Sequence, residues 1–510
     1  MEIRSASRVR LKTKTFAFRR CFVTSLATRE KMRLRTKLII AVSIFVVSYA
    51  TKSLQAVDLV PVMYTVEQPF GGLTETYDLR AVSILEGGGV LGPYEIDPSR
   101  TVWLAQAPGY SIYLSGVYRI TGRDFFRVQS IQNAINSISP ILIFLIAGSV
   151  VSWRVGVASG LLAAISHHLS HISNFILPDS ICALPLLAAA YVLVIATRHG
   201  LRSYWLWILA GVLIGTSAWL RSQIMLGGIF LSVVLVIVAF RRLATLKRVA
   251  FLLLASLLVI APITIRNYVV YGEFVPVQIG VGLNLWEGIA DASGDRFGAV
   301  RLDQEVAAQE ALLYDKPRYA GTWSSPDGIR RDRDRVKKSL DIVFQHPVWY
   351  AGVMLKRMRE MVKYSAHAPL VFKIDEARAR QRTLPIKPGW ESLAADPSSL
   401  GFGRSIFWMR PVVRALQRLV KEPMFYFVLL GAALMLLASW QRALFLGMVP
   451  LYYLLFQSFM HTEFRYTLPM QYFVFVFAAT IWVLLAGWVW AGLRIITKRY
   501  LSRPKPGLAG

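Results

Sequence analysis

The chain has 510 residues, of which 55% are hydrophobic, and its mean hydropathy is +0.46. This composition excludes a soluble multi-domain protein and predicts an all-α polytopic membrane protein. The net charge of +28 would suit a nucleic-acid partner, but the basic residues gather in the two tails and in short connections between apolar segments, which excludes nucleic acid.

The apolar segments predict about ten transmembrane helices (10–13), each close to the roughly 20 residues that cross a ~30 Å hydrocarbon layer. They lie at 38–57, 131–151, 155–176, 180–197, 204–220, 223–240, 249–265, 424–439, 443–460 and 468–493. Lys52 interrupts the first segment, so this segment is alternatively a signal-peptide core. Residues 1–37 form a basic tail, in which 1–31 reads as an extension before Met32 or as a disordered tail.

The basic residues of the short connections set the predicted orientation. These connections carry no acid, and their basic residues are Arg154, Arg198, Arg202, Arg241, Arg242, Lys247, Arg248 and Arg442. By the positive-inside rule, both termini are cytoplasmic, including a second basic tail at 494–510. The transmembrane parts are then 38–266 and 424–493, with a long first outer loop at 59–130 and a mixed extracytoplasmic region at 267–423.

The region 267–423 contains three stretches with helical patterns. The charged stretch RRDRDRVKK is predicted to be a solvated helix face. The segments 346–364 and 407–421 mix aromatic and basic residues, which is typical of helices in the membrane interface. Packing against neighbouring helices is the equally weighted alternative for both segments.

Polar residues collect at the outer ends of the predicted helices, where an ionisable group needs a partner or water and is a functional candidate. Glu75, Asp78 and Tyr110 lie in the first outer loop, and Asp179 lies at the start of the fourth helix. Arg221 ends the fifth helix and Arg266 ends the seventh. The stretch HTEFRYTLP follows the ninth helix and supplies His461, Glu463, Arg465 and Tyr466.

Several motifs together resemble the C-type glycosyltransferase superfamily over nearly the whole chain. They are the spacing from Tyr77 through Ala81 to Glu86-Gly87, then PGYSIYL, LPDS, WLRSQ, IRNYVVYGEFVPV with LNLWEG, and EFRYTLP. Among its members, the chain is most similar to bacterial protein mannosyltransferases and to the aminoarabinose transferase of lipid A. Only the region around 300–400 lacks a matching pattern.

The resemblance implies a membrane glycosyltransferase of the bacterial inner membrane with a periplasmic active site. The donor would be a polyprenyl-phosphate-linked sugar, transferred with inversion to a cell-envelope glycan or lipid, such as lipopolysaccharide, and less favourably to a protein. A carboxylate would act as the general base, and arginines would stabilise the phosphate leaving group. Arg221, Arg266, Arg465, Tyr466, Glu463 and Tyr110 are the implied donor-binding residues, and membrane lipid is a further partner.

The identity of the base is open between two residues. The family places its catalytic aspartate four residues before the loop tyrosine, and Leu73 occupies that position here. Glu75 and Asp78 are the nearest acids, with a slight preference for Glu75. Asp179 matches the second acidic position of the family, where it supports the site or binds a metal; alternatively it caps the fourth helix.

A divalent metal, magnesium or manganese, is a further expectation. His167 and His171 share a helix face in SHHLSHISN, a spacing that suits zinc or manganese. The favoured alternative is that these histidines form hydrogen bonds at the wet end of a helix. Glu287 in LNLWEG is a candidate rim contact, and the long side chains of Arg221 and Arg266 could instead extend to the interface.

Two other functions fit part of the pattern. A transporter or flippase for a lipid-linked sugar would also need basic residues in a membrane cavity, but the inverted repeat typical of transporters is not seen. A non-catalytic protein with this fold would explain the missing acid at position 73. Within HTEFRYTLP, Arg465 either pairs with Glu463 in a polar turn or faces an anionic donor, and the resemblance favours the second alternative.

Overall fold

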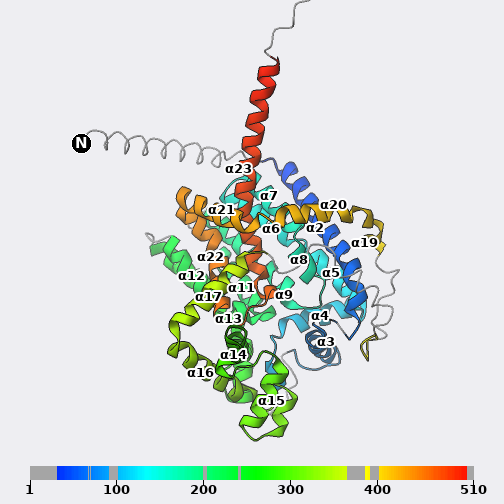
Figure 1. Cartoon of the computed structure of the whole chain (residues 1–510), viewed down its shortest axis with the longest axis vertical. Helices are drawn as coiled ribbons and strands as arrows, with labels where there is room; N and C mark the ends of the chain where they lie inside the picture. Colours follow the sequence, from blue (N-terminus) through cyan, green and yellow to red (C-terminus); the bar gives the residue numbers. More distant parts are fainter. Residues whose placement is uncertain are drawn as a thin grey trace, which may run out of the picture.

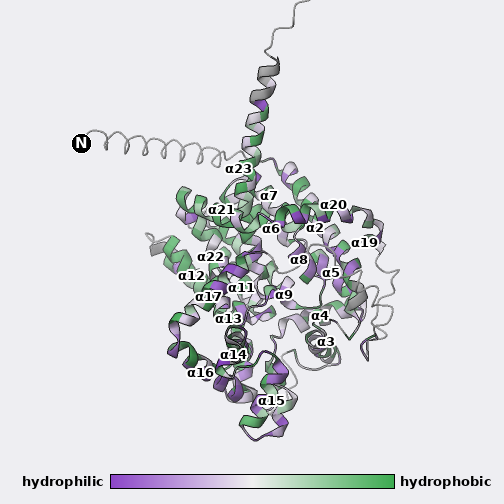
Figure 2. Cartoon of the chain, in the orientation of Figure 1, coloured by the Kyte–Doolittle hydropathy of each residue, from purple (hydrophilic) through white to green (hydrophobic). Residues whose placement is uncertain are grey.

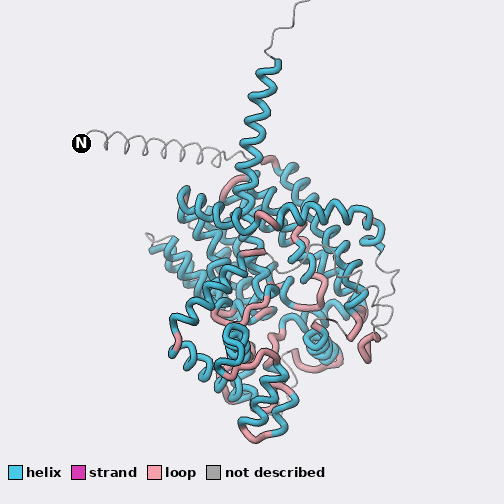
Figure 3. Tube along the Cα trace, viewed as in Figure 1, coloured by secondary structure: helices cyan, strands magenta, loops and turns pink. Residues whose placement is uncertain are grey.

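The computed structural model describes residues 32–66, 68, 70–90, 101–198, 204–238, 243–364, 385–390 and 401–501. The predictions for residues 1–31, for Arg202, Arg241 and Arg242, and for the end of the C-terminal tail lie outside these residues. Throughout the described residues the regular elements are helices, as Figure 3 shows. One isolated antiparallel bridge joins Thr65 to Ile386.

The first half of the chain forms the elements that surround the candidate site. They are α2 (Leu34–Met63), α3 (Gly71–Leu85), η1 (Thr101–Leu104), α4 (Gly109–Thr121), α5 (Phe125–Asn136), α6 (Ser139–Val150), α7 (Trp153–Ala164), α8 (His167–Ile172), α9 (Pro178–Ile181), α10 (Ala183–Arg198), α11 (Tyr204–Leu220), η3 (Ser222–Ile224), α12 (Gly227–Val238) and α13 (Leu243–Tyr271).

The second half adds the predicted extracytoplasmic region and the last apolar helices. Its elements are α14 (Val281–Ser293), η4 (Gly294–Phe297), α15 (Asp303–Leu313), η5 (Pro317–Gly321), α16 (Gly328–Gln345), α17 (Pro347–Val362), α19 (Gly401–Ser405), η7 (Phe407–Met409), α20 (Arg410–Lys421), α21 (Met424–Ala438), α22 (Trp440–Ser458), η8 (Phe464–Thr467) and α23 (Leu468–Leu501).

The protein is a multi-pass membrane protein. In the described part, five stretches are long and apolar enough to cross a membrane, namely Leu34–Leu59, Phe125–Val150, Pro178–Thr197, Thr245–Tyr271 and Phe464–Arg494. A sixth span results if α20 and α21, which are bent by 52°, count as one. The count of ten is not confirmed, because helices such as α11 are too short: its 17 residues rise only about 25 Å.

The first apolar segment is one continuous helix that passes through Lys52. The Lys52 side chain is buried, and its Nζ donates to Ser48 Oγ one turn earlier at 2.5 Å. The charge therefore has a hydrogen-bonding partner within its own helix, and it does not interrupt α2.

The segment predicted as one helix at 155–176 is broken. Helix α7 ends at Ala164, and α8 starts after Ser166, whose hydroxyl accepts a hydrogen bond from Leu169 N at 3.3 Å. Residues between α8 and α9 are not helical, and such backbone is tolerated among membrane helices only when protein groups satisfy it.

Polar side chains of α5 form hydrogen bonds with the backbone carbonyls of this irregular segment. Gln132 Nε2 donates to the carbonyls of Ser173 and Phe175 at 2.8 and 2.7 Å, and Gln129 Nε2 donates to that of Asn174 at 2.9 Å. Asn133 and Asn136 bond to the side chains of Asn174 and Ser180. Helix α5 therefore fixes the chain immediately before and around α9, which carries Asp179.

The elements α14–α16 and α3 lie toward the end of the molecule opposite the projecting C-terminal part of α23 (Figure 1). Hydropathy changes along the same direction, because α12 and α21 are mostly hydrophobic while α15 carries many hydrophilic residues (Figure 2). This difference in hydropathy agrees with the predicted division of the chain into a part within the membrane and a part outside it. The extracytoplasmic side of the second part remains a prediction.

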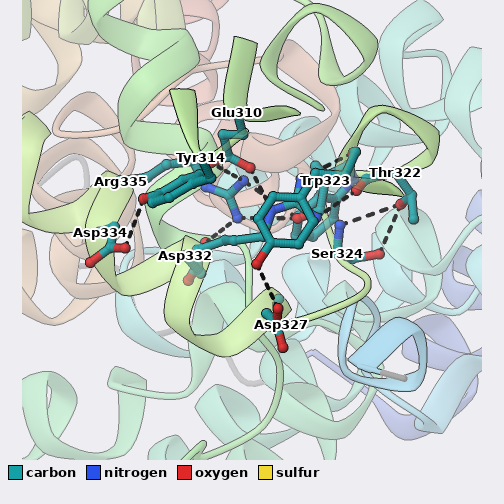
Figure 4. A network of polar contacts seen from close by, with 12 residues as sticks. Glu310, Tyr314, Thr322, Trp323, Ser324, Asp327, Asp332, Asp334 and Arg335 are labelled. Atoms are coloured by element: carbon teal, nitrogen blue, oxygen red, sulfur yellow. Dashed lines mark hydrogen bonds and ion pairs between the residues drawn. The ribbon is translucent and has the colours of Figure 1, made fainter. Parts of the chain in front are cut away.

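The solvated face predicted for RRDRDRVKK is wrong for three of its charges. Arg331 and Arg335 are buried, and Glu310 accepts hydrogen bonds from Arg331 Nε at 2.6 Å and Arg335 Nη1 at 3.0 Å. Asp332 is also buried, and its Oδ1 accepts from Gly282 N and Leu283 N in the first turn of α14. Figure 4 shows this network, which joins α14, α15 and α16 by ionic contacts.

Candidate active site

Asp179 lies at the centre of the candidate site, in the first turn of the short helix α9. The residue before this helix is Leu177 and Pro178 takes its first position, so the expectation that Asp179 caps a helix is wrong. The Asp179 side chain is fully buried, and its Oδ1 lies 3.1 Å from Arg221 Nη2. A buried carboxylate next to a buried guanidinium is far less costly than either charge alone.

Arg221 follows the last residue of α11 and reaches the site from there. Its guanidinium lies 4.8 Å from the centre of the Tyr466 ring, in a cation–π contact. On its other side is Tyr77 of α3, whose pKa is raised by burial while the charges of Arg221 and Arg465 oppose the rise. The site therefore joins segments separated by hundreds of residues in the sequence.

The stretch HTEFRYTLP forms the wall opposite α3. Glu463 accepts two hydrogen bonds from Arg465, from Nε at 2.5 Å and from Nη2 at 3.0 Å, as in the polar-turn alternative, and the favoured donor-facing role of Arg465 stays a prediction. Arg465 also donates to Tyr466 Oη at 3.1 Å and stacks 4.6 Å above the Phe70 ring. Burial and this bidentate contact hold the guanidinium in one orientation.

His461 extends this chain of contacts outward. Its Nδ1 lies 2.5 Å from Asp291 Oδ2, and its Nε2 lies 3.8 Å from Glu463 Oε1. Burial opposes the imidazolium, but the hydrogen bonds to Asp291 and Glu463 prevail and raise the pKa of His461 to about 9. For Glu463, burial is likewise outweighed by His461 and Arg465, and its pKa falls to about 2.

Three residues on one face of α14, Asn284, Gly288 and Asp291, contact the loop that contains His461. The backbone N of His461 donates to the Asn284 carbonyl at 2.7 Å, and Asp291 two turns later binds the His461 ring. Between them, a Cβ on Gly288 would lie 2.7 Å from His461 N, so only glycine allows the close approach. The sequence contained this i, i+4, i+7 spacing, but nothing marked its partner, and Asp291 was missed as a candidate.

The two candidate bases have different environments. Asp78 is buried, accepts a hydrogen bond from Tyr118 Oη at 2.7 Å and forms a two-pronged ion pair with Arg123. Glu75 has a side chain that is 46% exposed and forms an ion pair with Lys387. Asp78 already has its hydrogen bonds filled by these partners, whereas Glu75 is open to solvent and to a substrate.

Tyr110 and Arg266 occupy other positions than the Asp179–Arg221 pair. Tyr110 is buried, donates to Gln132 Oε1 at 2.8 Å and meets the Tyr77 ring edge-on, so it supports the site from behind. Arg266 does not end its helix, because α13 continues to Tyr271. It lies beside Arg80, a buried residue of α3 that sequence reasoning did not select.

Glu287 faces the same loop from α14. Burial first, and then a hydrogen bond to the carboxyl group of Asp303, raise the pKa of Glu287 to about 9. It is therefore a neutral carboxylic acid at neutral pH. Whether it contacts a substrate at the rim stays a prediction.

The residues expected to hold a metal do not assemble into a ligand set. Where the chain is described, no group of three or more His, Cys, Asp or Glu side chains has the geometry to hold an ion. His167 packs against the Tyr364 ring, and His168 stacks on Phe464 at 3.9 Å between ring centres. His171 meets the edge of Phe175, and Asp179 is paired with Arg221. No chemical step below is assigned to a metal.

Solved structures with a similar overall course come from an archaeal oligosaccharyltransferase of Archaeoglobus fulgidus. The form with Zn and sulfate has a TM-score of 0.43 and 12% identity, and covers 85% of this chain and 49% of its own. The apo form has a TM-score of 0.44 and 13% identity, with coverages of 92% and 53%. The complex with an inhibitory peptide and a dolichol-phosphate has a TM-score of 0.44 and 14% identity, and covers 92% of this chain and 52% of its own.

The chain thus spans about half the length of these solved structures. No curated protein matches the sequence significantly.

A family model gives the more specific result. Residues 105–265 match the model described as dolichyl-phosphate-mannose-protein mannosyltransferase. The matched segment contains Tyr110, Asp179 and Arg221, and the predicted C-type resemblance is confirmed there. Over residues 105–265 the chain is therefore similar to the dolichyl-phosphate-mannose-protein mannosyltransferase family.

Proposed function

We propose that the protein transfers a sugar from a polyprenyl-phosphate-linked donor to a cell-envelope glycan or lipid on the periplasmic face of a bacterial inner membrane. The observation that carries this proposal is the convergence of Asp179, Arg221, Arg465 and Tyr466 on one buried place. Two of these residues lie in the segment that matches the family, and two come from the HTEFRYTLP stretch.

The arginines suit the phosphate of the donor. When the bond from the anomeric carbon to the phosphate oxygen breaks, the lipid phosphate gains negative charge. Guanidinium groups held in a site with little water stabilise such charge strongly, and Arg465 is already oriented by Glu463. Asp179 would hold Arg221 ready for the same oxygen atoms.

Glu75 is the general base in this proposal. It would take the proton from the acceptor hydroxyl while the hydroxyl oxygen forms the new bond to the anomeric carbon, and the lipid phosphate departs with the electron pair of the broken bond. Because the hydroxyl attacks from the side opposite the departing phosphate in a single displacement, the configuration of the anomeric carbon is inverted. A positioned carboxylate typically contributes about 10²–10⁴-fold to such a step. The exposure of Glu75 and the filled bonds of Asp78 support this choice.

The orientation is supported by the placement of the described elements. Both α3 and α14, which line the site, lie at the end of the molecule away from the C-terminal part of α23 (Figure 1). If the basic tails are cytoplasmic, as the positive-inside rule predicts, the site then faces the periplasm. Lipid-linked donors and envelope acceptors both meet there.

The proposal is tested by sugar transfer with the purified protein in liposomes and a panel of polyprenyl-phosphate sugars. Glu75→Gln should reduce the transfer rate about 10²-fold or more with an unchanged melting temperature. Asp78→Asn should lower the melting temperature, because it weakens a buried ionic contact with Arg123. Glu273→Gln, which removes an exposed ion pair with Arg333, is the matched control.

Each result has a defined meaning. Full transfer by Glu75→Gln would show that Glu75 is not the base, and abolished transfer in folded Asp78→Asn would assign that role to Asp78. Movement of the lipid-linked sugar across the bilayer without transfer would instead identify a flippase.

A further inference from the structure

A second group of cations, the buried Arg80 and the half-buried Arg266, lies beyond Tyr77. Arg80 follows Tyr77 by three residues on α3, which places both on one face with about 4.5 Å of rise between them. Arg80 is only 5% exposed. Its Nη1 donates to the Gln106 carbonyl at 3.2 Å, and its guanidinium lies 5.5 Å from the Trp103 ring.

Arg266 supplies the other cation from α13. Its Nη1 donates to Asn267 Oδ1 at 3.3 Å, and its guanidinium lies 5.4 Å from the Tyr271 ring. The two cations act on each other, because burial and the positive charge of Arg266 lower the pKa of Arg80 to about 10. Tyr271 acts electrostatically on Arg80 as well, and its ring contacts the Arg266 guanidinium, so it links the two cations.

This pair differs from the arginines of the Asp179 site in its lack of a carboxylate. Arg221 pairs with Asp179 and Arg465 pairs with Glu463. The groups that act on Arg80 are Arg266, Tyr77 and Tyr271, and among the described residues no carboxylate forms an ion pair with Arg80 or Arg266. A buried guanidinium without a counter-ion is unfavourable, so Arg80 together with the half-buried Arg266 favours an anion.

The two arginines and two residues that they contact, Gln106 and Tyr271, carry polar atoms without partners in the described structure. Arg80 Nε, Arg266 Nη2, Tyr271 Oη and Gln106 Oε1 are all buried without a hydrogen-bond partner within the described structure. Two are N–H donors and one is a hydroxyl that donates; the Gln106 amide also presents an NH₂ group if its assignment is reversed. A buried polar group left without a partner costs about 1–3 kcal/mol, so such a concentration indicates a ligand.

We propose that Arg80, Arg266 and Tyr271 form a second anion subsite that binds a phosphate group of a substrate. This inference rests on the proposed function and adds to it that the enzyme handles two phosphate groups at once. One is the donor phosphate at Arg221 and Arg465. The other comes from a diphosphate-linked donor or from a phosphorylated acceptor, and both sources present the same tetrahedral oxyanion.

The first experiment measures anion binding and does not depend on sugar transfer. Inorganic phosphate is titrated by calorimetry into the full-length protein carrying Arg221→Gln, so that the Asp179 site contributes less. Adding Arg80→Gln should weaken phosphate binding about tenfold or more, the loss expected for one charge-assisted hydrogen bond. Arg333→Gln, an exposed arginine of the outer region, is the matched control and should leave the affinity unchanged.

Tyr271→Phe is the second variant, because Arg80→Gln could disturb folding. The Tyr271 hydroxyl has no hydrogen-bond partner among the described residues, so this change should leave the melting temperature equal or higher while it weakens phosphate binding several-fold. Unchanged phosphate affinity in both folded variants would overturn the subsite. A lowered melting temperature in Tyr271→Phe would do so too, since the hydroxyl would then have a structural bond.

The second experiment separates the two sources by kinetics. KM is compared for Arg80→Gln and the unaltered enzyme with monophosphate- and diphosphate-linked donors, and with phosphorylated and dephosphorylated acceptors. The variant should raise KM about tenfold for the substrate that brings the second phosphate and for no other. Equal KM changes in every arm would overturn the inference. If no substrate is turned over at all, the proposed function fails, while the calorimetry still decides the subsite.

Discussion

Individual charged residues show why this membrane protein tolerates so many ionisable groups. Asp179 is paired with Arg221, Asp78 with Arg123, and Glu463 with Arg465. A charge removed from water in this way needs a partner with good geometry, and here the partner usually comes from a distant segment. Arg80 differs from these cations, because no carboxylate among the described residues pairs with it, and the proposed anion subsite is built on this difference.

A pH-dependent stability is expected from His461. Its pKa of about 9 lies above the unfolded value of about 6.5, so the folded protein holds this proton more tightly. The stabilisation is complete below about pH 6.5 and is lost as the pH rises through about 9, by about 2 kcal/mol or less. Thermal melting between pH 6 and 10 should fall for the unaltered protein and stay flatter for His461→Gln.

Glu287 provides the necessary comparison for this pH experiment. Its pKa of about 9 is also raised above the unfolded value, so its contribution falls in the same direction as the pH rises. Glu287→Gln should therefore reduce the fall of the melting temperature between pH 6 and 10, and the part of that fall caused by His461 should remain. If His461→Gln shows the same pH slope as the unaltered protein, the contact with Asp291 is not ionic.

At the scale of elements, α5 is the support on which the site depends. Its amide side chains satisfy the backbone of the irregular segment before α9, where ordinary helical bonds are missing. Helix α14 has a similar role on the other side, since its stripe of Asn284, Gly288 and Asp291 fixes the loop that carries Arg465. Neither helix contributes a group to the proposed chemistry.

Gln132→Leu tests the role of α5. It leaves the buried carbonyls of Ser173 and Phe175 without donors and removes the acceptor of Tyr110, with an expected cost of about 2–4 kcal/mol. The change should appear as a lower melting temperature in detergent. Gln309→Leu also removes an amide that donates to a carbonyl and accepts from Trp286 Nε1, but at a half-buried position, and should cost less. Equal losses in both variants would contradict the assigned role.

Glu310→Gln tests the network of the outer elements. It leaves Arg331 and Arg335 buried with a neutral partner, and breaking a buried ionic group costs about 3–5 kcal/mol. Because Asp332 in the same network bonds the start of α14, protease cleavage in the 281–345 region should become faster. Exposed Glu273→Gln should leave the cleavage rate unchanged, and a stable Glu310→Gln protein would show that the network contributes little.

The whole molecule combines a bundle of apolar helices with an outer unit that covers one end. The spans found by length are fewer than the apolar segments of the sequence, because α7, α11 and α12 are shorter than a bilayer. Because the number of spans is not fixed by helix length alone, the orientation of the protein in the membrane is predicted from the basic residues of the short loops.

Cysteine labelling tests that orientation. In a Cys21→Ser background the remaining Cys182 is buried. Ala308→Cys, exposed on α15, should react with a membrane-impermeant maleimide added outside spheroplasts. Arg442→Cys, exposed near the start of α22, should react only after the membrane is opened. The opposite pattern would place the site in the cytoplasm and overturn the periplasmic assignment.

Much of the local structure was predictable. The span that begins at α2, the amphipathic α4 after Pro108, and the pairing of Glu463 with Arg465 follow from periodicity, turn residues and proximity in sequence. The break between α7 and α8 was not predicted, because the apolar residues around Ser166 and the histidines keep the mean hydropathy of the segment high. The burial of Arg331 and Arg335 was missed because their partner Glu310 lies on another helix.

By itself, the sequence determined that this chain is a helical, multi-pass membrane protein, and its motifs resemble those of lipid-phosphate glycosyltransferases, because apolar length and motif order are local properties. The tertiary structure decided which charges meet. It paired Asp179 with Arg221, tied Asp78 to Arg123, left Glu75 exposed, and set Arg80 beside Arg266 without an acid. Such choices depend on side chains from separate helices, whose desolvation is compensated only where the fold brings a partner within a few ångströms.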